Sequence, residues 1–142
     1  MSDSDLIKLY SGRILQLAAA IPHLRRLAEP GATVKKRSPL CGSTVTVDLV
    51  MKDGRVAEFA QDVKACALGQ ASAAVLGAVV HGRSLAELEA ARDALSAMLK
   101  EGGPAPEAPF DGYEVLLPAR DYKNRHASIL LALEAACAAA AG

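Results

Sequence analysis

The chain has 142 residues, which is the size of a single domain with one compact core, so we expect one domain over residues 1–142. Its 16 basic and 16 acidic residues cancel, and it has no Trp, two Phe and three Tyr. A protein of this composition offers neither a phosphate-neutralising surface nor a set of base-stacking rings, and we therefore expect no nucleic-acid partner.

Targeting signals are not evident in the sequence. No stretch approaches the roughly 20 strongly apolar residues of a membrane-spanning helix, and Asp3 and Asp5 stand where a secretory signal would carry Lys or Arg. We expect a cytoplasmic protein without membrane contact, whose thiols are reduced. Three cysteines in such a compartment indicate metal binding or a reactive thiol rather than a disulfide framework.

The first half of the chain predicts one helix followed by strands. Apolar residues recur at helical spacing from about residue 5 to 20, Asp5 can cap the start, and Pro22 ends the run. Three β-favouring segments follow, and Asp53-Gly54 between the last two is a strong hairpin signal. We expect a small antiparallel sheet of about three strands, over residues 32–36, 44–50 and 55–63.

The second half predicts helices. One begins at Cys66 and closes at Gly82, and the next opens on a capping box of Ser84 and Glu87 and runs until Pro104 interrupts the pattern. Residues 101–122 are expected to form a long connection, and residues 125–140 a last helix. Strands followed by helices predict an α+β fold, with the helices packed on one face of the sheet.

Three side chains could meet at one end of this fold: Cys41 in the turn between the first two strands, Cys66 where the sheet meets a helix, and His126 at the start of the last helix. The orphan N–H groups and the dipole at a helix N-terminus favour thiolate over thiol at Cys66. Two thiolates and an imidazole suit zinc or iron. Cys137 lies about 16 Å further along the last helix, too far to join them.

Each residue also has a simpler interpretation. Taken alone, Cys66 would more often be a small buried helix residue than a metal ligand, and His126 could be an exposed residue near a helix end. Cys41 sits in a Pro/Gly turn, where burial is hard to justify, and a ligand role is favoured there.

Five segments in order resemble the iron–sulfur cluster assembly scaffold family of the IscU and NifU N-terminal type. The opening Leu9-Tyr10-Ser11 is similar to that family's start, and the two cysteine segments are the most specific. The five read Pro-Leu-Cys-Gly at 39–42, Asp-Gly-Arg-Val at 53–56, Cys-Ala-Leu-Gly-Gln-Ala-Ser-Ala at 66–73, Gly-Arg-Ser-Leu at 82–85 and His-Ala-Ser-Ile-Leu at 126–130.

The resemblance implies a non-enzymatic scaffold or carrier. A [2Fe–2S] cluster would be assembled on it from iron and from persulfide sulfur supplied by a cysteine desulfurase, and then passed to recipient iron–sulfur apoproteins. Carried over by position, Cys41 and Cys66 match the family's first two cysteines, and His126 matches a His beside the third.

The chain departs from the family pattern at three places. Ser43 stands where the family has an Asp two residues after the first cysteine, so we count Ser43 with Cys41, Cys66 and His126 as a candidate metal ligand. Ala127 stands where the third cysteine would follow His126, although an alignment shifted by one residue places His126 on that cysteine. The segment at 117–120 (Leu-Pro-Ala-Arg) differs from the Leu-Pro-Pro-Val-Lys that a dedicated chaperone recognises in some members.

Other functions remain open at this stage. The same ligands could hold zinc, either in a regulator of cluster assembly or in a zinc-dependent hydrolase, although the hydrolase lacks an obvious carboxylate base because position 43 is Ser. Redox catalysis is disfavoured, since the chain has no Cys-x-x-Cys pair. If one cluster spans a homodimer, thiolates of the second chain would supply the missing ligand.

Overall fold

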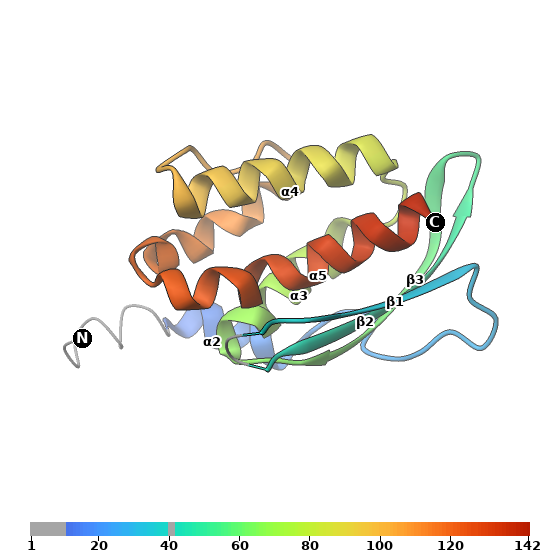
Figure 1. Cartoon of the computed structure of the whole chain (residues 1–142), viewed down its shortest axis with the longest axis horizontal. Helices are drawn as coiled ribbons and strands as arrows, with labels where there is room; N and C mark the ends of the chain where they lie inside the picture. Colours follow the sequence, from blue (N-terminus) through green and yellow to red (C-terminus); the bar gives the residue numbers. More distant parts are fainter. Residues whose placement is uncertain (1–10, 40–41) are drawn as a thin grey trace.

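A computed structural model describes residues 11–39 and 42–142. It has the predicted α+β architecture, a three-stranded antiparallel sheet with helices on one face (Figure 1). The elements in chain order are α2 (Gly12–Ala19), β1 (Ala32–Arg37), β2 (Thr44–Lys52), β3 (Arg55–Lys64), α3 (Ala67–Val79), α4 (Leu85–Lys100), the 3₁₀ segment η1 (Phe110–Asp121) and α5 (Lys123–Ala141).

The sheet has the order β1-β2-β3, and the predicted hairpin joins its last two strands. Lys52 pairs with Arg55, which leaves a two-residue turn whose residues Asp53 and Gly54 have φ values of 54° and 76°. Positive φ at both positions is the requirement of a type I′ turn, which matches the right-handed twist of the strands. The hairpin prediction is confirmed.

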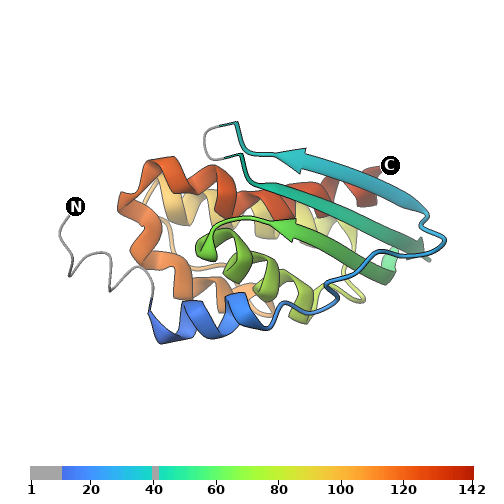
Figure 2. The same cartoon turned by 90° about the horizontal axis from the view of Figure 1, so that it is seen from below.

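The core lies between the sheet and the helices. Val45, Val47 and Leu49 alternate along β2 and are all buried on the face that the helices cover. Figure 2 shows α5 running over β1 and β2, with α3 beside it. Helix α4 and η1 pack on α5 and α3 rather than on the sheet, as a further layer (Figure 1). The core therefore has two parts, one between the sheet and the helices that cover it and one between helices alone.

The chain between α2 and β1 is tied to the sheet by polar contacts. The backbone N–H of Gln61 donates to the carbonyl of His23 over 2.9 Å, beside an isolated bridge between Leu24 and Gln61. The buried Gln61 side chain donates to the carbonyls of Ala73, over 3.0 Å, and of Pro22, over 3.2 Å. One glutamine thus links this segment, β3 and α3.

The predicted helix over residues 5–20 can be compared with the structure from Ser11 onward, where α2 covers Gly12–Ala19. Helix α2 begins at Gly12, because the Ser11 hydroxyl accepts the Ile14 N–H over 3.4 Å and caps it there. The predicted cap Asp5 and the Tyr10 motif lie outside the described residues.

The predicted long connection contains structure of its own. Residues 110–121 form η1, in which four buried side chains recur every three residues, the period of a 3₁₀ helix. They are Phe110, Tyr113, Leu116 and Ala119. The Gly and Pro residues before and within this segment concealed the period in the sequence.

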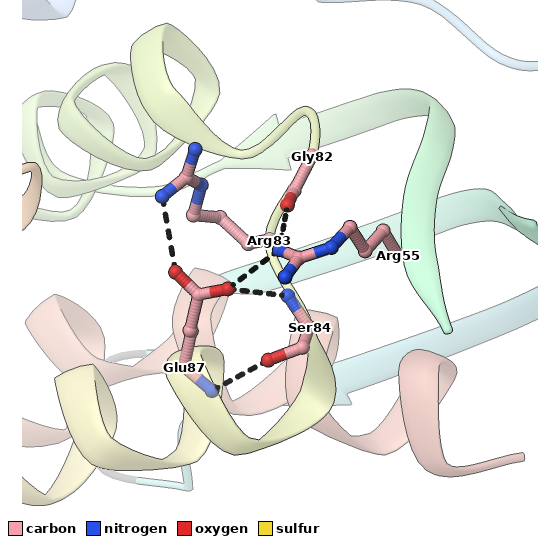
Figure 3. Close-up of polar contacts among 5 residues, drawn as sticks. All are labelled: Arg55, Gly82, Arg83, Ser84 and Glu87. Atoms are coloured by element: carbon pink, nitrogen blue, oxygen red, sulfur yellow. Dashed lines mark hydrogen bonds and ion pairs between the residues drawn. The ribbon is translucent and has the colours of Figure 1, made fainter. Parts of the chain in front are cut away.

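Helix α4 begins at the predicted capping box, which is confirmed (Figure 3). The Glu87 N–H donates to the Ser84 hydroxyl and the Ser84 N–H donates to the Glu87 carboxylate, each over 3.2 Å. The same carboxylate pairs with Arg55 at 2.9 Å and with Arg83 at 3.0 Å. This cap therefore also joins α4 to β3.

Within the described residues, no helix combines the length and the apolar character that crossing a membrane requires.

Candidate metal site

The functional candidates lie at one end of the molecule. The end of β1, the start of β2, the N-terminus of α3 and the first turns of α5 all lie at the left of Figure 1. Cys66, Ser43 and His126 come from three of these segments. Cys41 lies outside the described residues, so its role stays a prediction.

Cys66 is the N-cap residue of α3. Its backbone is extended, with φ −67° and ψ 170°, and its side chain makes no capping hydrogen bond. The residue is half-buried. A side chain at this place lies beside the first N–H groups of the helix, which have no partner within it.

The Ser128 hydroxyl lies beside Cys66, and the Ser43 hydroxyl lies beside that of Ser128. Cys66 Sγ is 3.6 Å from the Oγ of Ser128, and Ser128 Oγ donates a hydrogen bond of 3.2 Å to Ser43 Oγ. Either atom can be the donor in the contact between Cys66 and Ser128. Ser43 and Ser128 are 5% and 1% exposed, so both serines are buried.

Ser43 is held in place by the turn that precedes β2. Its backbone carbonyl accepts the Ser38 N–H over 2.8 Å, and the Gly42 N–H donates to the Ser38 carbonyl over 3.0 Å. Gly42 has a φ of +70°, a conformation that most other residues adopt only at a cost. The turn therefore fixes where the Ser43 hydroxyl lies.

A close approach of α3 to α5 brings Ser128 to Cys66. A Cβ added at Gly69 would lie 2.6 Å from Ser128 Oγ and 2.8 Å from the Ala65 Cβ, so only glycine leaves room here. One turn further along α3, the buried Ser72 hydroxyl donates to the Ile129 carbonyl over 2.5 Å. These two contacts set the register between the helices.

His126 is buried, but its ring is engaged elsewhere. Nε2 lies 3.0 Å from both the Ala119 and the Arg120 carbonyl oxygens, at the end of η1. Carbonyl oxygens only accept, so Nε2 carries the proton and Nδ1 is the nitrogen left for a ligand role. His126 precedes Ser128 by two residues, about 200° around the helix, so the two side chains leave α5 on nearly opposite faces.

The structure thus links Cys66 to Ser43 through Ser128, and it places His126 in the first turn of α5, with its ring bonded to the end of η1. Among the residues that the structure describes, no three His, Cys, Asp or Glu side chains form a metal-binding group. Cys137 is buried in the body of α5, where burial raises the pKa of its thiol to about 11. A neutral, enclosed thiol of this kind is a core residue.

Sequence reasoning did not single out Ser128 or Gly69. Both lie inside quoted motifs, at the third position of the His-Ala-Ser segment and the fourth of the second cysteine segment. The available signal was the combination of the two residues. A glycine near the start of a helix lowers helix stability, which indicates that a neighbouring segment needs the space, and a serine lies in the helix that packs against it.

The comparisons with known proteins come from solved structures. The N-terminal part of a nitrogen-fixing NifU-like protein from Brucella abortus matches with a TM-score of 0.92 and 50% sequence identity, over 95% of this chain and 94% of that one. A SUF-system protein from Fervidobacterium islandicum AW-1, assigned as an iron–sulfur cluster assembly scaffold, matches with a TM-score of 0.83 over 94% and 98% of the two chains, but at 17% identity it shows the fold alone.

A third structure, of a hypothetical protein, matches with a TM-score of 0.80 and 21% identity and again shows the fold only. No protein-family model matches the sequence, and no curated protein does so at a significant level. Half of the residues are identical to those of the Brucella abortus protein over nearly the whole of both chains, which confirms the resemblance of the ordered motifs: the chain belongs to the IscU/NifU-like scaffold family.

Proposed function

We propose that this protein is an iron–sulfur cluster assembly scaffold or carrier, which binds iron or a [2Fe–2S] cluster as cargo and passes it to recipient proteins. Membership of the NifU-like family, at 50% identity over 95% of the chain, carries this proposal. The protein acts by binding and transfer rather than by catalysis, in the cytoplasm. Its partners are a cysteine desulfurase, which supplies the sulfur, and iron–sulfur apoproteins, which receive the cluster.

The donor atoms at the site fit this cargo. Cys41 and Cys66 supply thiolates, the ligands that iron–sulfur clusters use most, and Ser43 supplies an oxygen. His126 can contribute only through Nδ1 while its Nε2 donates to the η1 carbonyls. This set is smaller and harder than an all-cysteine set, so we expect a cluster that leaves readily. Thiolates of a second chain in a homodimer would complete the coordination.

A second candidate is a zinc-binding regulator of cluster assembly. Ala127 leaves no third cysteine to receive persulfide sulfur, and two thiolates with oxygen or nitrogen donors also suit tetrahedral zinc. A zinc hydrolase receives less support, because the side chains linked to Cys66 within the described part of the chain are the hydroxyls of Ser128 and Ser43, which are not the carboxylate that such a base requires.

Anaerobic reconstitution with ferrous iron, sulfide and reductant tests the proposal. Near-stoichiometric iron and acid-labile sulfide, with the visible absorption of a cluster, are expected for the wild type and should be lost in Cys41→Ala and Cys66→Ala. Cys137→Ala is the matched control, since its thiol is buried away from the site, and it should load normally. Tight zinc binding without cluster uptake would overturn the scaffold role and favour the regulator.

A further inference from the structure

We propose that the free edge of β1 binds an extended acidic segment of a partner protein, which adds to the sheet as a further strand; this inference goes beyond the proposed function and needs no metal. Strand β1 is the first in the order β1-β2-β3, so among the described residues its outer edge has no neighbouring strand. Figure 2 shows β1 along the border of the sheet. Such an edge is a row of N–H and C=O groups to which extended peptides bind through main-chain hydrogen bonds.

The opposite edge of the sheet is already occupied. On the outer side of β3, Gln61 forms a bridge with Leu24, and Arg55 forms a bridge with Ser84. The chain before β1 and the chain before α4 therefore cover β3 near both of its ends. This leaves β1 as the edge at which a strand can be added.

The pairing of β1 with β2 decides which backbone groups point outward. The Ser38 N–H donates to the Ser43 carbonyl over 2.8 Å, and the register continues from there along β1 without a shift. Hydrogen-bonded and non-hydrogen-bonded pairs alternate along an antiparallel ladder, so the N–H and C=O groups of Thr33, Lys35 and Arg37 are directed away from β2. A peptide at this edge would bond to these three residues.

The side chains of β1 are strongly basic. Lys35, Lys36 and Arg37 are consecutive and exposed, and within the described part of the chain none of them forms an ion pair. Arg37 pairs with Thr44 and Thr44 pairs with Lys64, so a fourth cation lies in the same row of the sheet. Lys35 and Arg37 share one face, and Asp or Glu at alternate positions of an added strand would lie beside them.

Lys36 lies on the other face, toward the helices. It lines a hollow of about 360 Å³ together with Glu89 of α4 and with Glu134 and Ala138 of α5. The intervening side chains of an added strand would point to this side of the sheet, where the walls hold both signs of charge and small residues. The open face thus selects acidic side chains, and the hollow accepts small or polar ones between them.

The charge of β1 argues against a second copy of this chain as the occupant. Pairing two β1 edges would bring the three cations of each copy to one short ladder, where like charges destabilise the pairing. Lysine on edge strands is one way in which sheets avoid pairing with their own copies. An acidic segment would neutralise the same charges, and the edge therefore favours a different, acidic partner.

Binding should be measured by fluorescence anisotropy with a labelled peptide of alternating Glu and Val residues. One control peptide has Lys in place of Glu and tests the charge, and a second has every backbone N–H methylated and tests the main-chain hydrogen bonds. We expect the first peptide to bind, more weakly as salt is added, and both controls to bind at least about 10-fold more weakly.

Two variants test the place of binding. Lys35→Glu/Arg37→Glu should weaken binding by about 10-fold or more, because opposite-charge pairs across the strands become like-charge pairs. Lys52→Glu is the matched control, since Lys52 is an exposed strand cation at the hairpin end of the sheet, and it should bind as the wild type does. Far-UV circular dichroism checks that both variants fold.

Hydrogen exchange followed by NMR locates the peptide on the strand. The N–H groups of Lys35 and Arg37 should become protected when the peptide binds, whereas those of Val34 and Lys36, which are directed to β2, should change little. The pattern of alternate protection distinguishes addition at the edge from a purely ionic contact of the side chains.

The proposal is overturned if the Glu peptide does not bind, if the methylated or the Lys peptide binds equally well, or if Lys52→Glu weakens binding as much as the double variant does. Edge amides that are protected in the free protein, increasingly so at higher protein concentration, would assign the edge to a second copy instead. None of these outcomes bears on cluster uptake, so the proposed function stands or fails separately, by reconstitution.

Discussion

Asp48 and Arg26, 22 residues apart in the sequence, form a two-pronged ion pair between the middle of β2 and the segment that precedes β1. Arg26 Nε lies 2.6 Å from Asp48 Oδ2, and Nη2 lies 3.1 Å from Oδ1. The same buried carboxylate accepts the Leu27 N–H over 3.1 Å and the Thr33 hydroxyl over 2.6 Å. The Arg26 hydrogen bonds, followed by those of Thr33 and Leu27, lower the pKa of Asp48 to about 2.

Asp48→Asn should therefore destabilise the fold by about 1.5–3 kcal/mol at neutral pH, the range for hydrogen bonds to a charged group. A carboxyl group whose pKa is lower in the folded protein stabilises the fold at pH values above its ordinary pKa of 3.8. That contribution is lost as the pH falls from 3.8 through the folded-state pKa of about 2. Urea unfolding at several pH values should thus show the wild type and Asp48→Asn converging in acid. Asp53→Asn, in the exposed turn, is the control and should change stability by less than about 0.5 kcal/mol. A constant difference down to the lowest pH would contradict the ion-pair account.

Gly69→Ala should disturb the contact between α3 and α5. Its new methyl group would lie 2.6 Å from Ser128 Oγ, and the overpacking should cost about 1–3 kcal/mol and lower the yield of reconstituted cluster. Gly12→Ala in α2 is the matched control, because nothing lies within 4 Å of its added Cβ, and it should leave stability unchanged or raise it. Thermal unfolding of both variants checks the pair. Equal effects would show that the helices do not need the space at Gly69.

The cap of α4 makes a separable prediction (Figure 3). Ser84→Ala removes the acceptor of the Glu87 N–H and should cost about 1 kcal/mol of stability, independent of salt. Glu87→Gln keeps an oxygen for the Ser84 N–H but loses the ion pairs with Arg55 and Arg83, so its smaller cost should shrink as salt is added. Unfolding at low and high ionic strength distinguishes the two variants. A salt-dependent Ser84→Ala effect would assign the cap's contribution to charge instead.

The lowered pKa of His23 predicts that the protein loses stability in mild acid. Its partial burial, the facing His81 ring at 4.7 Å and the nearby Arg25 all lower its pKa, while a hydrogen bond with the Gly77 backbone acts in the opposite direction. A base with a lowered pKa binds its proton more readily in the unfolded chain, so stability is complete above the ordinary value of 6.5 and falls as the pH drops below it.

His23→Asn should flatten this dependence between about pH 7 and 5. Asparagine is the suitable replacement, because His23 has a φ of 59° and asparagine tolerates that conformation. Unfolding free energies across this pH range, compared with those of the wild type, are the measurement. An unchanged slope in the variant would assign the acid sensitivity to another group.

Local signals predicted most of the fold correctly. The Asp53-Gly54 turn and the Ser84–Glu87 cap are decided by residues within a few positions of each other, so their chemistry can be read from the chain directly. The period of three in η1 was equally local, but it lies among Gly and Pro residues that suggested a loop. The predicted helix from residue 5 can be compared with the structure only from Ser11 onward.

The sequence by itself determined the α+β architecture and the family, and it supplied the cysteine segments of the candidate site. Only the tertiary structure decided that Ser128, and not His126, faces Cys66, 62 residues away. Adjacent positions on a helix differ by about 100°, so the choice depends on how α5 is rotated against α3. That rotation is set by the space at Gly69 and by the bond from Ser72 to Ile129, which are contacts between distant segments that no local pattern encodes.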